Sequence, residues 1–155
     1  MKQTIKTEKI LSAYKVLSNA KYTKLGDADK VKVWKIARAL KPIATKFEED
    51  SKDAAEKFKP SDDFADRLQK AQEYERMLHA NADMANSPMG AAEYGAFVDE
   101  FQRYNQLVTN AVKEYADKEV EISFDGLSED AFGKLMASNE WTMEQVIEIG
   151  TLIVE

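Results

Sequence analysis

The stretch VWKIARALKPIATKFEEDSKDAAEKF, residues 33–58, decides the fold of this chain. Apolar or small side chains recur along it at intervals that alternate between four and three residues. The members of this row are Val33, Ala37, Leu40, Ala44, Phe47, Ser51, Ala54 and Phe58. Such a heptad pattern predicts one amphipathic helix over residues 28–58, about 46 Å long at about 1.5 Å per residue. Because the pattern keeps its phase across Pro42, we expect a kink there and not the end of the helix.

Two further helical rows follow this stretch, one weak and one strong. The weak row, in a helix that begins near residue 62, consists of Phe64, Leu68, Ala71, Glu75, Leu78 and Ala82. The strong row, between residues 91 and 116, consists of Tyr94, Phe97, Phe101, Tyr104, Val108, Ala111 and Tyr115. The strong rows predict an elongated antiparallel helical bundle, a coiled-coil hairpin over about residues 27–116. The weak helix is then a crossover between two antiparallel long helices, and an up-down-up order of the three helices is the alternative.

The two ends of the chain predict a smaller part with one strand. A first helix is expected from Thr4 or Thr7 to residue 19. Alternation of apolar and polar side chains predicts a half-buried strand over residues 119–124. Its partner is either a short strand at residues 22–25 or the same strand in a second copy, because a lone strand leaves its backbone groups unpaired.

Two short helices complete the predicted fold. Ser128 is expected to cap a helix over residues 129–137, and the capping box from Thr142 to Gln145 begins the last one. That last helix is expected to use Val146, Ile147 and the apolar residues that follow for packing. We expect residues 119–155 to pack with residues 1–25. The prediction is therefore a single domain over residues 1–155, mainly α, with a minor two-stranded β element.

Charge is distributed unevenly along the chain. The 155 residues carry a net charge of −6. Residues 1–46 hold 12 basic and 3 acidic side chains, a net of +9, whereas residues 47–155 hold 10 basic and 25 acidic ones, a net of −15. Acidic helices of the same chain or of a second copy would compensate the basic third. The alternative is a nucleic-acid surface, which the net negative field of the whole chain disfavours.

The residue types that carry chemistry are sparse. The absence of cysteine excludes disulfides, thiol nucleophiles and cysteine-ligated metals. His79, the single histidine, has no partner motif, and Asp27 and Asp29 lack the other ligands of a calcium loop. An acidic row at the start of the last helix, expected to be a solvated face, consists of Glu140, Glu144 and Glu148. We therefore expect no enzyme, catalytic residue, cofactor or metal. With neither an apolar leader nor a membrane-spanning run, we expect a soluble cytoplasmic protein.

An interaction protein that acts through helix–helix contacts is the function these features favour. The expected interface residues are Val33, Leu40, Phe47, Phe58, Phe97, Phe101 and Tyr104. The expected contacts to nucleic acid or to an acidic partner are Lys30, Lys32, Lys35, Arg38 and Lys41. We expect a homodimer through the long helices or a helical protein partner, with nucleic acid as the alternative. No membrane partner or small-molecule substrate is expected. Trp34 is expected to pack against the first helix or a partner helix.

Three segments of the chain resemble small uncharacterised helical proteins of bacterial phages and prophages. They are residues 33–42 with Leu40-Lys41-Pro42, residues 118–124 with Lys118-Glu-Val-Glu-Ile122, and the last two short helices. The resemblance covers about half of the chain and does not extend to residues 61–90. It implies an origin in a phage or mobile element and an accessory or structural role. No functional residue carries over, because none of these segments is a catalytic motif.

Overall fold

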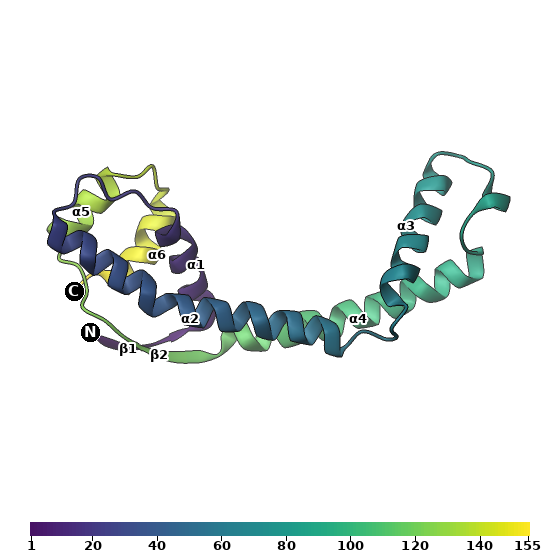
Figure 1. Ribbon diagram of the computed structural model, residues 1–155, viewed down its shortest axis with the longest axis horizontal. Helices are drawn as coiled ribbons and strands as arrows, with labels where there is room; N and C mark the ends of the chain where they lie inside the picture. Colours follow the sequence, from purple (N-terminus) through teal and green to yellow (C-terminus); the bar gives the residue numbers. More distant parts are fainter. The chain divides into compact units, whose positions relative to one another are not determined.

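The computed structural model describes residues 1–155 and is mainly α-helical, with one small antiparallel sheet (Figure 1). The elements are β1 (Lys2–Lys6), α1 (Thr7–Ser18), α2 (Asp27–Lys57), α3 (Phe64–His79), the 3-10 turn η1 (Met84–Asn86), α4 (Ala91–Asp117), β2 (Glu119–Ser123), α5 (Glu129–Ala137) and α6 (Met143–Ile153). They fall into two compact units. The terminal unit comprises Met1–Asp50 with Glu114–Glu155, and the central unit comprises Ser51–Lys113. The predicted fold class, mainly α with a minor β element, is confirmed.

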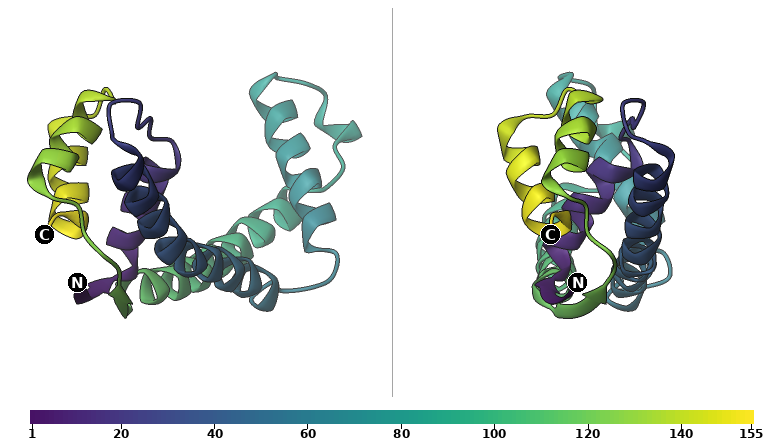
Figure 2. Two further views of the ribbon diagram at one scale, coloured as in Figure 1. Left: turned by 60° about the vertical axis from the view of Figure 1, so that its left-hand side comes forward. Right: turned by 90° about the vertical axis from the view of Figure 1, so that its left-hand side faces the viewer.

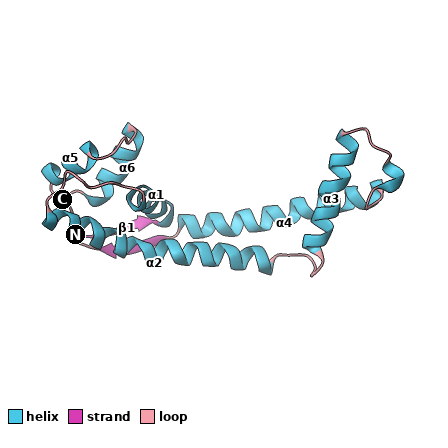
Figure 3. Cartoon of the chain, turned by 45° about the horizontal axis from the view of Figure 1, so that its top comes forward, coloured by secondary structure: helices cyan, strands magenta, loops and turns pink.

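The strand at residues 119–123 is confirmed, but its expected partner within the chain was wrong. β2 pairs antiparallel with β1, in a register that places Lys2 opposite Ser123 and Lys6 opposite Glu119 (Figure 3). Residues 20–25 form a turn and not a strand, because the Leu25 amide bonds to the Tyr22 carbonyl. The amides of Lys21 and Lys24 in this turn bond to side chains at the end of α5. Residues 20–25 are therefore held as a loop against another helix.

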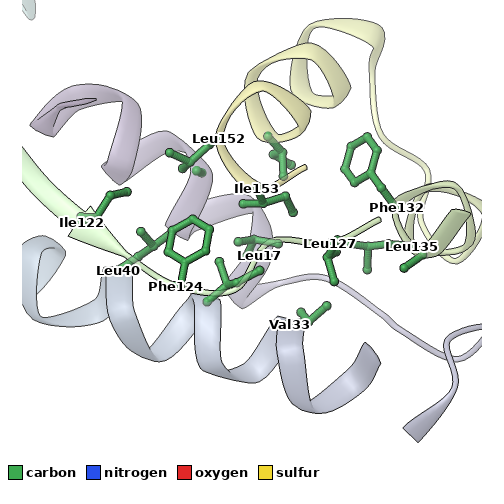
Figure 4. Packing of buried hydrophobic residues seen from close by; sticks show 14 of the residues in the cluster. Leu17, Val33, Leu40, Ile122, Phe124, Leu127, Phe132, Leu135, Leu152 and Ile153 are labelled. Carbon is green, nitrogen blue, oxygen red and sulfur yellow. The ribbon is translucent and has the colours of Figure 1, made fainter. Parts of the chain in front are cut away.

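The core of the terminal unit is aliphatic and draws on both ends of the chain (Figure 4). Its buried members are Ile10, Ala13, Leu17, Leu25, Val33, Ile36, Leu40, Ile122, Phe124, Leu127, Ala131, Phe132, Leu135, Ile149, Leu152 and Ile153. Helices α1, α5, α6 and the first half of α2 surround this core together with β2. Residues 1–25 and 119–155 thus pack against each other, and their apolar burial stabilises the unit.

Side-chain caps fix the two C-terminal helices where the sequence predicts them. Ser128 accepts a hydrogen bond from the Ala131 amide at the start of α5. At the start of α6, Thr142 and Gln145 form the complete capping box. Each cap satisfies amides that the first helical turn leaves unpaired. These contacts confirm both predicted helix starts.

Pro42 lies inside α2 and does not end it. The proline ring is on the exposed side of the helix, so the carbonyl of Arg38 that loses its partner also faces away from the core. The buried residues of α2 are Val33, Ile36, Leu40 and Ala54. Ile36 thus takes the place of Ala37 in the predicted row, and the rest of that row is only partly buried. The prediction of one helix over residues 28–58 that continues through Pro42 is confirmed, since α2 spans Asp27–Lys57, and the expected kink at Pro42 stays a prediction.

The central unit has a smaller, aromatic core between α3 and α4. Its buried residues are Phe64, Ala71, Tyr74, Met89 and Phe97. The ring centroid of Phe64 lies 4.9 Å from that of Tyr104, and the rings of Tyr74 and Tyr94 stack at 4.4 Å. The predicted row of the third helix was wrong at Glu75, because the core uses Tyr74 in that turn, and at Leu78 and Ala82, which are exposed. Burial of the Tyr74 ring is favourable, whereas burial of a carboxylate would cost free energy.

Candidate interaction surfaces

The outward side of α2 in the terminal unit combines basic and exposed apolar side chains. Val33, Ile36 and Leu40 point into the core, so the opposite side of the helix faces out. We call that side the basic face; it consists of Val31, Trp34, Lys35, Arg38 and Lys41. Trp34 is 56% exposed and Val31 is 50% exposed, both large values for side chains of this type.

Trp34 and Arg38 form the centre of the basic face. They stand one helical turn apart, and the Arg38 guanidinium lies 5.2 Å from the centroid of the Trp34 ring. A cation over an aromatic face holds both groups in place at the surface. The expectation that Trp34 packs against α1 within one copy is therefore not met. The pair presents a flat apolar ring and a charged donor to any partner.

The charges of this face are not neutralised by the chain itself. None of its three cations, Lys35, Arg38 and Lys41, forms an ion pair within 4.0 Å, and neither do Lys30 and Lys32, which are half-buried and lie outside this face. Basic residues nearer the sheet behave differently, since Lys2 pairs with Glu121 at 3.0 Å and Lys6 with Asp117 at 3.8 Å. Internal compensation is thus present along β1 and absent from the basic face of α2. Unpaired surface cations attract anionic groups of a partner.

The turn before α2 adds to the basic character of this region. Lys21, Tyr22 and Lys24 are all exposed there, and the Tyr22 ring is 46% exposed. An aromatic ring between two lysines is the kind of grouping that stacks bases and contacts phosphates. Residues 21–41 therefore carry both features that the nucleic-acid alternative needs.

The outward side of α6 is acidic and also carries exposed apolar side chains. We call it the acidic face; it consists of Met143, Glu144, Ile147 and Glu148 on the helix and Glu140 in the loop that precedes it. Met143 is 71% exposed and Ile147 is 62% exposed. None of the three glutamates forms an ion pair within 4.0 Å.

Ile147 corrects one detail of the sequence prediction. It was expected to pack inside the fold, but the core uses Ile149, Leu152 and Ile153. Those three residues share one side of the helix, and Ile147 lies out of phase with them. The spacing itself carried the signal that Ile147 faces outward.

A groove of about 950 Å³ runs beside the acidic face, between β1 and α6. Ile5 and Ile147 contribute apolar surface to it, and Lys9 and Glu144 stand among its charged residues. It is open to solvent on one side, so a flat side chain of a partner has access to its apolar wall. The acidic face therefore borders a groove, whereas the basic face carries the exposed ring of Trp34.

The residues expected at helix–helix interfaces lie in several different places. Val33 and Leu40 are buried in the core of the terminal unit. Phe97 is buried in the central unit, where Phe101 and Tyr104 pack against the same core. The remaining two, Phe47 and Phe58, are half-buried. The exposed side chains include those of the basic and acidic faces, which the apolar rows did not indicate.

A bidentate salt bridge joins α3 and α4 in the central unit. Arg67 on α3 donates to both carboxylate oxygens of Glu100 on α4, at 2.7 and 3.0 Å. These hydrogen bonds raise the pKa of Arg67 and lower the pKa of Glu100. The guanidinium also lies 5.6 Å from the ring centroid of Phe97 and 5.9 Å from that of Phe64. The pair joins two helices through a core edge, which is a structural role.

The groups considered for chemistry in the sequence do not assemble into a site. His79 is exposed and lies 3.7 Å from Glu75, one turn back on the same helix. No set of three or more histidine, aspartate or glutamate side chains is arranged to hold a metal ion. None of the helices combines the length and the apolar character that crossing a bilayer requires. Comparisons of the chain with protein-family models, with curated proteins and with solved structures found no match.

Proposed function

We propose that this chain is a non-enzymatic interaction protein that binds a macromolecular partner through helix faces of its terminal unit. The observation that carries the proposal is the pair of exposed apolar groups, Trp34 with Val31 and Met143 with Ile147, each beside unpaired charges of one sign. Large exposed apolar side chains that cluster on one face favour a docking role over a purely solvated one.

An accessory or structural role in a phage or prophage is the setting that the sequence resemblance suggests for this function. Such a role is compatible with a chain that acts by contact alone. The proposal therefore rests on the two faces, and the phage setting remains a part of it that only the resemblance supports.

Site-specific photo-crosslinking tests the proposal. A photo-reactive amino acid replaces Trp34 in one version of the chain and Ile147 in another, and each is illuminated in cells that produce it. We expect discrete covalent adducts from both positions. Leu78 provides a matched control, because it is a 50% exposed apolar residue outside both faces and is expected to give none. No adduct from either face, or equal adducts from the control, would contradict the proposal.

Nucleic-acid binding by the basic face is the second candidate. The exposed rings of Tyr22 and Trp34 among unpaired lysines favour it. Fluorescence anisotropy with labelled single and double strands measures it directly. Binding that weakens steeply with salt and is lost in Lys35→Ala with Arg38→Ala would support this candidate. Absence of binding at low salt removes it and leaves the first proposal intact.

A further inference from the structure

The basic face and the acidic face lie on opposite sides of one core. Val33 on α2 and Ile153 on α6 enter that core from two sides (Figure 4). Figure 2 shows α1 between these two helices when the terminal unit is viewed from its end. The outward sides of α2 and α6 therefore point apart. One copy of the terminal unit cannot bring its own two faces together.

The two faces are complementary in charge and alike in apolar content. The basic face carries Lys35, Arg38 and Lys41 beside an exposed tryptophan. The acidic face carries Glu140, Glu144 and Glu148 beside an exposed methionine and isoleucine. Contact between the two would pair opposite charges and remove apolar surface from water at the same time.

We propose that the basic face of one copy binds the acidic face of the next copy, head to tail. In this arrangement the Trp34 ring enters the groove beside Ile147, and Arg38 approaches Glu144. Tryptophan and arginine are the side chains that most often dominate interface energetics. The inference rests on the proposed function and names its partner as a second copy of this chain.

A second copy fits these observations better than nucleic acid does. A phosphate backbone would neutralise the basic face but would be repelled by the acidic face. Met143 and Ile147 would then remain exposed. A second copy covers both faces with surfaces that the chain already has.

Head-to-tail contact also predicts the form of the assembly. An interface between two different faces is heterologous, and with the faces on opposite sides it leaves one free face at each end. Such contacts generate rings or open chains of copies, in place of the two-fold dimer expected from the sequence. The average mass should rise with concentration beyond that of a dimer.

Two blocked variants test this arrangement. Trp34→Ser with Arg38→Ser removes the centre of the basic face, and Met143→Ser with Ile147→Ser removes the apolar part of the acidic face. All four side chains are exposed, so both variants should fold, which circular dichroism checks. In sedimentation equilibrium from micromolar to submillimolar concentration, each variant alone should stay at the chain mass of 17.5 kDa.

The mixture of the two variants gives the decisive reading. Each retains the face that the other has lost, so an equimolar mixture should form a dimer of twice 17.5 kDa that grows no further. A chain in which the charges of both faces are exchanged, with Lys35→Glu, Arg38→Glu, Glu140→Lys and Glu144→Lys together, should still self-associate, because the two faces remain complementary. Leu78→Ser with Leu107→Ser is the matched control, because both residues are exposed and apolar but lie in the central unit. The control should assemble like the unmodified chain.

Several results would overturn the proposal. They are an unmodified chain that stays at 17.5 kDa throughout, a mixture that forms no dimer, or a blocked variant that assembles alone as the unmodified chain does. Crosslinks from Trp34 or Ile147 to other macromolecules would still support the proposed function in those cases. The failure of head-to-tail assembly is thus distinguishable from the failure of the interaction role.

Discussion

The two units of this chain stabilise themselves in different ways. The terminal unit buries 16 side chains in one core, nearly all aliphatic, from five helices and strands. The central unit buries five, mostly aromatic, and adds a bidentate ion pair at the core edge. Stability from burial scales with the apolar area removed from water, so the terminal unit should be the more stable of the two. The comparison shows that the smaller unit is stabilised by contacts between aromatic rings and by an ion pair, whereas the larger unit is stabilised by the burial of many aliphatic side chains.

The largest effect is expected from Leu40→Ala in the terminal unit. Leu40 is fully buried, so its truncation leaves a cavity and should lower the free energy of unfolding by about 3 kcal/mol. Chemical denaturation followed by circular dichroism measures this loss. Ile147→Ala is the control and should cost less than about 0.5 kcal/mol, because Ile147 is exposed. Equal losses in the two variants would mean that Leu40 is not a core residue.

A smaller effect is expected from Phe64→Leu in the central unit. The Phe64 ring contacts three other aromatic rings, and leucine retains most of its volume, so the loss should be about 1–2 kcal/mol. Hydrogen exchange should show faster exchange of α3 amides, with little change in α1 and α6. Uniform acceleration across both units would show that they unfold as one cooperative body.

The salt bridge between α3 and α4 should contribute less again. Arg67→Met removes the bidentate pair and leaves Glu100 without its partner, which should cost about 1 kcal/mol. Lys46→Met is the matched control, because Lys46 forms a single exposed pair with Asp50 at 2.7 Å. The control should lose much less stability by the same measurement, because water screens an exposed pair. A larger loss in the control would contradict a special role for Arg67.

The smallest effect is the acid response of the same pair. The hydrogen bonds from Arg67 lower the pKa of Glu100 in the folded state. The stabilisation is therefore complete above the unfolded-state pKa of about 4.3 and is lost as the pH falls through the lower folded-state pKa. Glu100→Gln should flatten this part of the pH dependence in denaturation experiments. An unchanged acid response would exclude Glu100 as its source.

Sequence periodicity and cap residues predicted the helices that bury one side along their length. α2, α4 and the starts of α5 and α6 belong to this group, because local spacing and cap residues define them. β1 was missed, since Lys2–Lys6 has one strongly apolar residue and its partner strand lies more than a hundred residues away. The strand expected at residues 22–25 does not form, because hydrogen bonds to side chains at the end of α5, distant in sequence, hold these residues as a loop.

The candidate surfaces were predictable only in part. The five basic residues expected as contacts lie on α2, as the sequence predicts, and three of them, Lys35, Arg38 and Lys41, belong to its basic face. That these cations are unpaired depends on which acidic side chains the fold brings near, and no local pattern contains that information. The exposure of Ile147 was readable from its phase against Ile149, Leu152 and Ile153. Its position beside a groove was not, because β1 supplies the other wall.

The two units are expected to fold at different times during synthesis, because the sheet of the terminal unit joins strands from the two ends of the chain. The amino group of Met1 donates to the carbonyl of Phe124, 123 residues later, and β1 has no partner until β2 emerges from the ribosome. The central unit is continuous in sequence and can fold while the rest is still being made. At about 5–20 residues per second, residues 1–50 wait several seconds for their core partners. During that interval Ile10, Leu17 and Leu40 are exposed on the nascent chain, and any chaperone that protects this protein should bind there first.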